Sequence, residues 1–266
     1  MLDCKVMVIP DVHGRTFWKR PVMKALSEQC RVVFLGDYLD PYQYENISFP
    51  KALSVFKEII ALKRAYPDLI TLLLGNHDLG YLWPKINTCR LNRKYFAEVA
   101  RLLSENLDLF QLTEVQSFNG SNFLFSHAGV SGKWVSLHSK ELTGKDDADF
   151  STFIAKLEEG WRNVFKDGTV LPMLAEIGST RNGRDSVGSC VWADMLDTIS
   201  EPHPLEPNLV QIFGHTQQMR EPVNICNQYY NLDCRQVFYI DYCGNIRFYT
   251  TDAIIPQTSL TSVTNC

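Results

Sequence analysis

The 266-residue chain lacks the features of several specialised protein classes. Its apolar runs are short, and none approaches the roughly 20 residues that a membrane-spanning helix needs. The run at Lys5 to Pro10 has neither a cationic leader nor a small-residue cleavage site, so we expect no signal peptide, no membrane partner and a cytoplasmic location. A Gly-x-x-x-x-Gly-Lys-Ser/Thr loop is also missing, which disfavours phosphoryl transfer of the P-loop kind.

Cysteine is sparse and scattered along the chain. The eight cysteines form no Cys-x-x-Cys pair, and eight are too few for a disulfide scaffold at this length. Since metal-ligand spacing is missing too, a cysteine zinc site is disfavoured. We therefore expect reduced, mostly structural thiols at Cys4, Cys30, Cys89, Cys190, Cys226, Cys234, Cys243 and Cys266.

An excess of positive charge is lacking as well. The formal net charge of −4 argues against general nucleic-acid binding, which usually requires a basic stripe. Small anionic substrates are still compatible with this charge, because a metal site supplies its own local positive charge. Hydrophobic residues make up 45% of the chain and charged residues 21%, a globular composition at a length that supports one large core.

The first half of the chain alternates short apolar runs with helical patterns. The runs at Val6–Ile9, Val32–Leu35 and Ile70–Leu74 each end at Gly, Asp or Asn within a few residues. Helical patterns lie between them, near Phe17–Ser27 and over Lys51–Ala65. This alternation predicts βαβ units around a buried sheet, and therefore an α/β fold.

The second half has a different pattern. Leu91–Asn106 predicts a helix, and Asn119-Gly120 predicts the turn of a β-hairpin. Helices and loops are expected over 130–205, a strand at Leu209–Phe213, and short paired strands over 221–250.

No repeat or linker marks a second domain. We expect a single domain over residues 1–250, followed by a loosely held, Ser/Thr-rich C-terminal tail over residues 251–266.

Polar residues follow the apolar runs at the points where the predicted strands end. In open α/β sheets, ligands bind at the carboxyl ends of the strands. Carboxylates and imidazoles together suit Mn, Fe or Zn. Two such ions about 4 Å apart can hold both oxygens of a phosphoryl displacement. The residues in question are Asp11, His13, Asp37, Asp40, Asn76, His77, His127 and His215.

Five blocks around these residues resemble the calcineurin-like metallophosphoesterases, in the order typical of that family. They are Asp11-Val12-His13, Gly36-Asp37-Tyr38-Leu39-Asp40, Gly75-Asn76-His77-Asp78, Ser126-His127-Ala128-Gly129 and Gly214-His215-Thr216. The resemblance implies a four-layer α/β/β/α sandwich with two mixed sheets. It also implies hydrolysis of a phosphate ester by metal-activated water, without a covalent phosphoenzyme.

The same resemblance implies a role for each residue. Asp11 and His13 bind the first metal ion, and Asp37 bridges both ions. The second ion is bound by Asn76, His127 and His215.

Two further residues of these blocks are implied to be catalytic. His77 protonates the leaving oxygen, and Asp40 orients its ring. An adjacent carboxylate fixes the tautomer of an imidazole and favours its charged form, so this pairing is physically sensible.

The sequence departs from the family at several positions. Gln217 replaces the second histidine of Gly-His-x-His, which favours the phosphoprotein-phosphatase branch, and Val191-Trp192-Ala193-Asp194 is similar to a segment of that branch. His127-Ala128-Gly129 resembles the symmetrical dinucleoside tetraphosphate hydrolases of the same branch.

Pro41 and Leu74 stand where the phosphoprotein-phosphatase branch has arginines that grip the phosphate. We consider Arg15, Arg181 and Arg184 as substitutes, against the plainer interpretation of solvated loop arginines.

Other polar and aromatic residues have plainer interpretations. His138 and His203 match no block and are interpreted as surface or loop residues. Asp78 is expected to cap its loop. Trp134 and Trp161 are expected to pack in the core, with a cleft-lining role as the alternative.

Three functions follow from these observations. The first is hydrolysis of a phosphomonoester, including protein Ser/Thr phosphate. The second is cleavage of a dinucleoside polyphosphate or a phosphodiester. The third is a regulatory protein that binds metal at a degenerate site. The expected partner is a phosphorylated small molecule, a nucleotide or a phosphoprotein.

Overall fold

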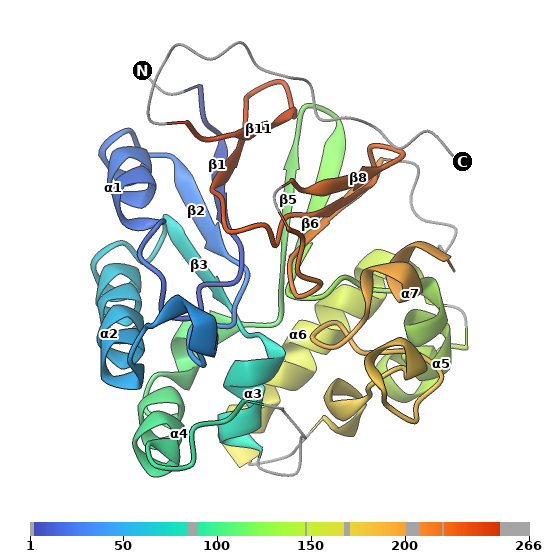
Figure 1. The fold of residues 1–266 in the computed structure, drawn as a ribbon. Helices are drawn as coiled ribbons and strands as arrows, with labels where there is room; N and C mark the ends of the chain where they lie inside the picture. Colours follow the sequence, from blue (N-terminus) through green and yellow to red (C-terminus); the bar gives the residue numbers. More distant parts are fainter. Residues whose placement is uncertain are drawn as a thin grey trace.

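The structure, a computed structural model, describes residues 3–83, 90–146, 148–167, 171–200, 208–219 and 221–250 (Figure 1). The predicted C-terminal tail and His203 therefore lie outside the described residues.

The first sheet has six strands in the order β11-β10-β1-β2-β3-β4. β1 to β4 run parallel, whereas β10 and β11 are antiparallel to their neighbours. The strands are β1 (Val6–Ile9), β2 (Arg31–Phe34), β3 (Ile70–Leu73), β4 (Phe110–Gln111), β10 (Phe238–Ile240) and β11 (Ile246–Phe248). The mixed sheet thus joins the beginning of the chain to residues near 240.

The second sheet has five strands in the order β5-β6-β7-β9-β8. β6, β7 and β9 are parallel, and β5 and β8 pair antiparallel at the two edges. The strands are β5 (Thr113–Phe118), β6 (Ser121–Ser126), β7 (Leu209–Phe213), β8 (Val223–Ile225) and β9 (Tyr229–Asn231). Asn119 and Gly120, both with positive φ, form the predicted hairpin turn between β5 and β6.

The two sheets pack face to face through alternate side chains of their strands. Val6 and Val8 of β1 point into the same buried cluster as Phe123 and Phe125 of β6. The intervening residues of the first sheet, such as Met7, pack instead against the helices. Because β1 to β3 are covered on both faces, their residues are almost all apolar; the exceptions are Arg31 at the exposed start of β2 and Thr71 in β3.

Helices cover both outer sides of the paired sheets. α1, α2 and α4 lie beside the first sheet, and α5, α6 and α7 lie on the side of the second (Figure 1). The helices are α1 (Lys19–Ser27), α2 (Phe49–Ala65), α3 (Asn76–Leu82), α4 (Phe96–Ser104), α5 (Gly132–Thr143), α6 (Phe150–Asp167) and α7 (Met195–Ser200). Short 3-10 turns lie at Gln43–Glu45, Leu107–Leu109, Pro172–Ala175 and Ser179–Arg181. This is the predicted α/β/β/α arrangement, and the described ranges contain no membrane-crossing helix.

The helix predicted over Leu91–Asn106 is shorter than expected, since α4 begins only at Phe96. Asn92 explains the late start. Its side-chain oxygen accepts hydrogen bonds from the backbone N–H groups of Lys94, at 3.1 Å, and Tyr95, at 3.4 Å. This Asn-centred turn satisfies the N–H groups that precede the helix, so the helix begins after it.

The expectation of reduced cysteines is wrong for part of the set. Cys4 and Cys30 form a disulfide across a Cα separation of 5.9 Å, and Cys226 is disulfide-bonded as well. Cys4 precedes β1 and Cys30 precedes β2, so the parallel pairing of these strands brings the two thiols together. Their separation of 26 residues carries no sign of this pairing. Cys190 and Cys234 are free and buried, as expected of structural thiols.

Candidate metal centre and active site

The carboxyl ends of strands from both sheets meet at one edge and deliver the predicted site residues there. Asp11, Asp37 and Asn76 follow β1, β2 and β3 of the first sheet. His127 and His215 follow β6 and β7 of the second. Residues up to 204 positions apart thus become neighbours: the His215 N–H donates to Asp11 Oδ1 at 3.0 Å.

Four residues of this edge have a left-handed backbone conformation. His13, Asp37, Asp40 and His215 have φ angles of 44°, 51°, 58° and 64°. Such angles are uncommon for residues other than glycine and are sustained where the surroundings impose them. Here the constraint is visible, because the His13 N–H donates to the Asp37 carbonyl at 2.7 Å.

The first group of ligand atoms comprises Asp11, His13 and Asp37, whose donor atoms all lie within 4.8 Å of one another. His13 Nε2 lies 3.9 Å from Asp11 Oδ2 and 3.6 Å from Asp37 Oδ2. Its other nitrogen, Nδ1, donates a hydrogen bond to the Leu39 carbonyl at 2.7 Å. This contact leaves the lone pair on Nε2, the arrangement usual for histidines that bind metal.

The second group comprises Asp37, His127 and His215, again within 4.8 Å. His127 Nε2 lies 3.6 Å from Asp37 Oδ1 and 3.1 Å from Asn76 Oδ1, while its Nδ1 donates to the Leu35 carbonyl at 2.8 Å. His215 Nε2 is buried and has no hydrogen-bond partner among the described residues. A buried nitrogen without a partner is costly unless an ion or another ligand engages it.

Burial favours the neutral form of two of these imidazoles, those of His13 and His215. Burial lowers the pKa of His13 and of His215 well below the usual value, and Arg181 lowers that of His215 further. Burial alone would raise the pKa of Asp37, but the neighbouring imidazoles, His127 foremost, outweigh it and hold that pKa below its ordinary value. Neutral imidazole beside carboxylate is the protonation state that binds a metal ion.

Two glycines leave space for the carboxylates of the candidate metal site. A Cβ on Gly75 would lie 2.1 Å from Asp37 Oδ1, and one on Gly214 would lie 2.3 Å from Asp11 Oδ1. Both distances are far below van der Waals contact. A side chain at either position would therefore displace a carboxylate of the site.

Together these residues fit a pair of metal ions. The two groups share Asp37, whose Oδ2 faces His13 and whose Oδ1 faces His127. The donors are carboxylate, imidazole and amide oxygen, a mixture that suits first-row transition metals.

His77 is buried beside the metal groups and does not belong to either of them. Its Nδ1 lies 2.9 Å from Asp40 Oδ2, and Asp40 Oδ1 accepts a hydrogen bond from the Tyr81 hydroxyl at 2.6 Å. Burial raises the pKa of Tyr81, and Asp40 raises it further, so the phenol remains a donor at neutral pH. Tyr81 is not among the site residues predicted from the sequence. It lies four residues after His77 on α3, a spacing that places both side chains on one face of the helix.

Asp78 has the predicted capping role. Its carboxylate accepts hydrogen bonds from the N–H groups of Asp37 at 2.8 Å, Tyr38 at 3.2 Å and Gly75 at 2.9 Å. It thereby ties the loop after β2 to the start of α3, and so aligns the loops that carry Asp37 and His77.

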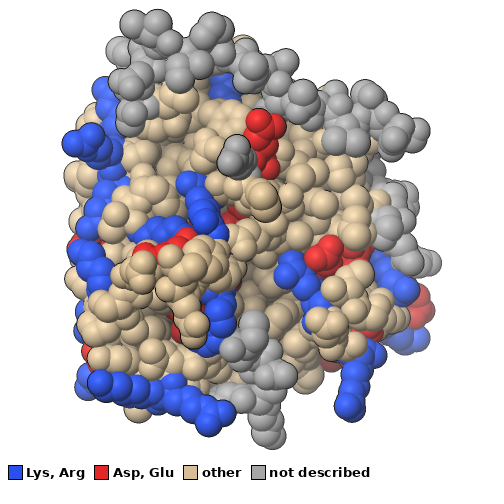
Figure 2. Space-filling model, viewed as in Figure 1, with Lys and Arg blue, Asp and Glu red and all other residues tan. Residues whose placement is uncertain are grey.

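The arginines considered from the sequence are placed unequally. Arg15 pairs with Glu45 at 2.9 Å and donates to the Asp11 carbonyl at 3.1 Å. Arg181 lies against His215 but pairs with Asp194 at 2.9 Å, and Arg184 is exposed. Basic and acidic side chains accordingly lie side by side around the middle of the face in Figure 2. Two of the three cations are thus partly neutralised.

Arg90 is the main residue that sequence reasoning missed. Its guanidinium donates to the Asp40 carbonyl at 2.7 Å and lies 3.3 Å from both His13 Nε2 and His77 Nε2. It also lies over the Tyr42 ring, 3.7 Å from the centroid. No motif surrounds Arg90 in the sequence, so only the fold reveals its position.

The tryptophans and His138 have the plainer roles. Trp134 and Trp161 are buried in the core and donate to Glu176 and to the Phe110 carbonyl. His138 pairs with Glu176 at 2.8 Å, away from the metal groups. The burial of both tryptophans favours packing in the core over the cleft-lining alternative.

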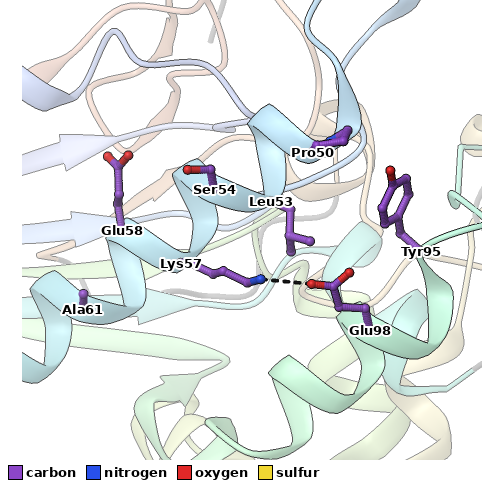
Figure 3. Close-up of a pocket in the computed structure, with 8 residues that line it drawn as sticks. All are labelled: Pro50, Leu53, Ser54, Lys57, Glu58, Ala61, Tyr95 and Glu98. Carbon is purple, nitrogen blue, oxygen red and sulfur yellow. Dashed lines mark hydrogen bonds and ion pairs between the residues drawn. The ribbon is translucent and has the colours of Figure 1, made fainter.

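A separate surface hollow of about 600 Å³ lies between α2 and the region of α4 (Figure 3). It is crossed by an ion pair between Lys57 and Glu98 at 2.9 Å. None of the candidate metal ligands lines it. The candidate metal residues therefore lie at the strand edge and not in this hollow.

Comparisons with known proteins agree with this geometry. A model of the calcineurin-like phosphoesterase family matches residues 4–219. Among solved structures, a mutant cold-active protein tyrosine phosphatase has 17% sequence identity and a TM-score of 0.54, covering 93% of this chain and 82% of that one. A cold-active protein tyrosine phosphatase of a psychrophilic Shewanella species has the same identity and coverage, with a TM-score of 0.51. A protein serine/threonine phosphatase from Saccharomyces cerevisiae has 14% identity and a TM-score of 0.51, covering 96% of this chain and 81% of that one. At such low identities these structures share the fold.

Proposed function

This chain belongs to the calcineurin-like phosphoesterase family, and from that premise we propose that it hydrolyses phosphomonoesters, those of phosphoproteins included, with two metal ions bound. The family and its phosphatase neighbours make the chain a phosphoric ester hydrolase. The proposal adds the kind of ester and the roles of individual residues.

The position of Asp37 carries the proposal. Its two carboxylate oxygens face different imidazoles, each at 3.6 Å, in two ligand groups that have only this residue in common. A shared carboxylate holds two ions close together. We propose that Asp11 and His13 complete one site, and that Asn76, His127 and His215 complete the other, with Mn, Fe or Zn as the ions.

The bound ions would supply positive charge for the phosphate and lower the pKa of a water molecule. The protein's own residues hold the proton that the leaving group needs. We propose that His77 donates a proton from Nε2 to the leaving oxygen. Asp40, bonded to Nδ1 at 2.9 Å and fixed by Tyr81, would keep the ring in that orientation.

Two alternatives have weaker support. Cleavage of a dinucleoside polyphosphate or a phosphodiester rests on the resemblance of His127-Ala128-Gly129 to the tetraphosphate hydrolases. The structural neighbours, named as protein phosphatases, favour monoesters instead. A degenerate regulatory protein is disfavoured by the intact contact between His77 and Asp40.

The decisive experiment compares substrates after EDTA treatment and re-addition of Mn²⁺. We expect hydrolysis of p-nitrophenyl phosphate that exceeds hydrolysis of bis(p-nitrophenyl) phosphate and of a dinucleoside tetraphosphate. Faster cleavage of either of the latter would replace the monoester proposal. Inactivity on the whole panel, with metal bound, would favour the regulatory alternative.

A further inference from the structure

We propose that Arg90 binds the phosphate of the substrate and favours phosphomonoesters over diesters, an inference that rests on the proposed function. Pro41 and Leu74 stand at the two positions where the family resemblance implies arginines that grip the phosphate. Arg90 comes from a different part of the chain, beyond α3, and reaches the same edge as the metal groups.

The guanidinium of Arg90 lies at the boundary between the metal groups and the predicted acid. One of its nitrogens is 3.3 Å from His13 Nε2, in the first metal group, and 3.3 Å from His77 Nε2. The rings of His13 and His77 are themselves only 5.2 Å apart. A phosphate held between the metal group and His77 must therefore lie within reach of this nitrogen.

The hydrogen-bond acceptors around this nitrogen are needed for other purposes. His13 Nδ1 donates to the Leu39 carbonyl, so Nε2 has a single lone pair, which can serve Arg90 or a metal ion but not both. His77 Nε2 cannot accept from Arg90 while it carries the proton intended for the leaving group. When His13 binds a metal ion and His77 carries its proton, this guanidinium nitrogen of Arg90 has neither acceptor. A phosphate oxygen of the substrate is the group that replaces them.

The remainder of the side chain is already fixed. The other terminal nitrogen donates to the Asp40 carbonyl at 2.7 Å, and the guanidinium lies 3.7 Å from the centroid of Tyr42. Tyr42 in turn contacts the His13 ring edge-on at 5.1 Å. Such preorganisation reduces the entropy lost when a ligand is bound.

Arg90 also retains its charge for the substrate. Arg15 and Arg181 lie close to the site but pair with Glu45 and Asp194, each at 2.9 Å. Among the described residues, no carboxylate lies within ion-pair distance of Arg90, which contacts a carbonyl, two imidazoles and a tyrosine ring.

Selectivity follows from the number of phosphate oxygens and their charge. A phosphomonoester has three terminal oxygens and carries up to two negative charges, whereas a diester has two terminal oxygens and one charge. Metal ions and a guanidinium compete for these oxygens. The monoester can satisfy both, so the loss of Arg90 should affect the monoester more than the diester.

The test compares Arg90→Ala and Arg90→Lys with Arg93→Ala, an exposed arginine three residues further along the chain. For Arg90→Ala, we expect kcat/KM for p-nitrophenyl phosphate to fall roughly 10- to 100-fold, and the rate for bis(p-nitrophenyl) phosphate to fall by a much smaller factor. Arg90→Lys should recover only part of the loss, because an ammonium lacks the planar fork. Arg93→Ala should match the wild type.

A binding measurement separates this proposal from the proposed function. Calorimetry with inorganic phosphate and the Mn²⁺-loaded proteins should show weaker binding to Arg90→Ala than to Arg93→Ala, with equal Mn²⁺ content and melting temperature. Unchanged phosphate affinity, or equal losses on both esters, would refute the role of Arg90. A wild type that hydrolyses no monoester yet binds phosphate through Arg90 would overturn the proposed function and leave the phosphate-binding role supported.

Discussion

His77 Nδ1 lies 2.9 Å from Asp40 Oδ2, and both side chains are almost completely buried. The contact joins the loop after β2 to the beginning of α3 across 37 positions of the sequence. Asp40 is held in turn by Tyr81, which also accepts a hydrogen bond from the N–H of Asn92 at 2.9 Å. The orientation of the His77 ring is therefore fixed by a chain of partners and not by a single bond.

His77→Asn should lower kcat by about 10²- to 10⁴-fold, the usual contribution of a general acid. The loss should be greater for an alkyl phosphate than for p-nitrophenyl phosphate, because p-nitrophenolate leaves readily without a proton. Steady-state rates on both substrates, with Mn²⁺ content determined in parallel, measure this difference. Equal losses on the two substrates would show that His77 does not protonate the leaving oxygen.

Asp37→Asn should remove both activity and metal, since Asp37 belongs to both ligand groups. An amide lacks the charge and offers one oxygen in place of two. We expect at least about 10-fold weaker Mn²⁺ binding, a lower bound taken from changes to residues that merely support metal ligands. The matched control is Asp68→Asn, an exposed aspartate, which should retain Mn²⁺ as the wild type does. Full Mn²⁺ occupancy in Asp37→Asn would contradict the shared-ligand role.

Much of the site could be predicted because its residues follow apolar strands directly. Asp11, Asp37 and His127 lie within three residues of a strand end, and parallel strands deliver such positions to one edge. Arg90 could not be predicted this way, because it does not follow a strand and its contacts are with Asp40, His13 and His77. Nor could the disulfide between Cys4 and Cys30, which depends on the pairing of β1 with β2. Residues that directly follow a strand can be placed from the sequence, whereas contacts that depend on how separate segments pack cannot.

Gly75→Ala should damage the metal site more than the fold. Its added methyl group would lie 2.1 Å from Asp37 Oδ1, so the carboxylate or the backbone must move. Overpacking of this kind costs about 1–3 kcal/mol of stability. Mn²⁺ affinity and melting temperature should both fall. Gly160→Ala in α6, whose nearest neighbour would be a flexible Leu171 side chain at 3.3 Å, should leave Mn²⁺ binding unchanged.

Glu158 should make stability depend on pH in an unusual direction. It lies on α6, where Oε1 accepts hydrogen bonds from the N–H groups of Leu112 and Thr113 and from the Thr113 hydroxyl, while Oε2 is buried without a partner among the described residues. Burial outweighs these bonds and raises the pKa of Glu158 from 4.5 to about 7. The folded state therefore holds the proton more tightly than the unfolded state.

The sign of the effect follows from this difference in proton affinity. The contribution of Glu158 to the free energy of unfolding is complete below pH 4.5 and is lost as the pH rises towards 7. At about 1.4 kcal/mol for each pKa unit, it amounts to a few kcal/mol at most. Urea unfolding at a series of pH values should show this decline in the wild type and a flatter dependence in Glu158→Gln, whose amide keeps an acceptor for Leu112 and Thr113. Glu159→Gln, an exposed neighbour on the same helix, should retain the wild-type slope. If Glu158→Gln retains it too, the decline originates elsewhere, and the carboxylate at 158 is ionised in the folded protein throughout this range.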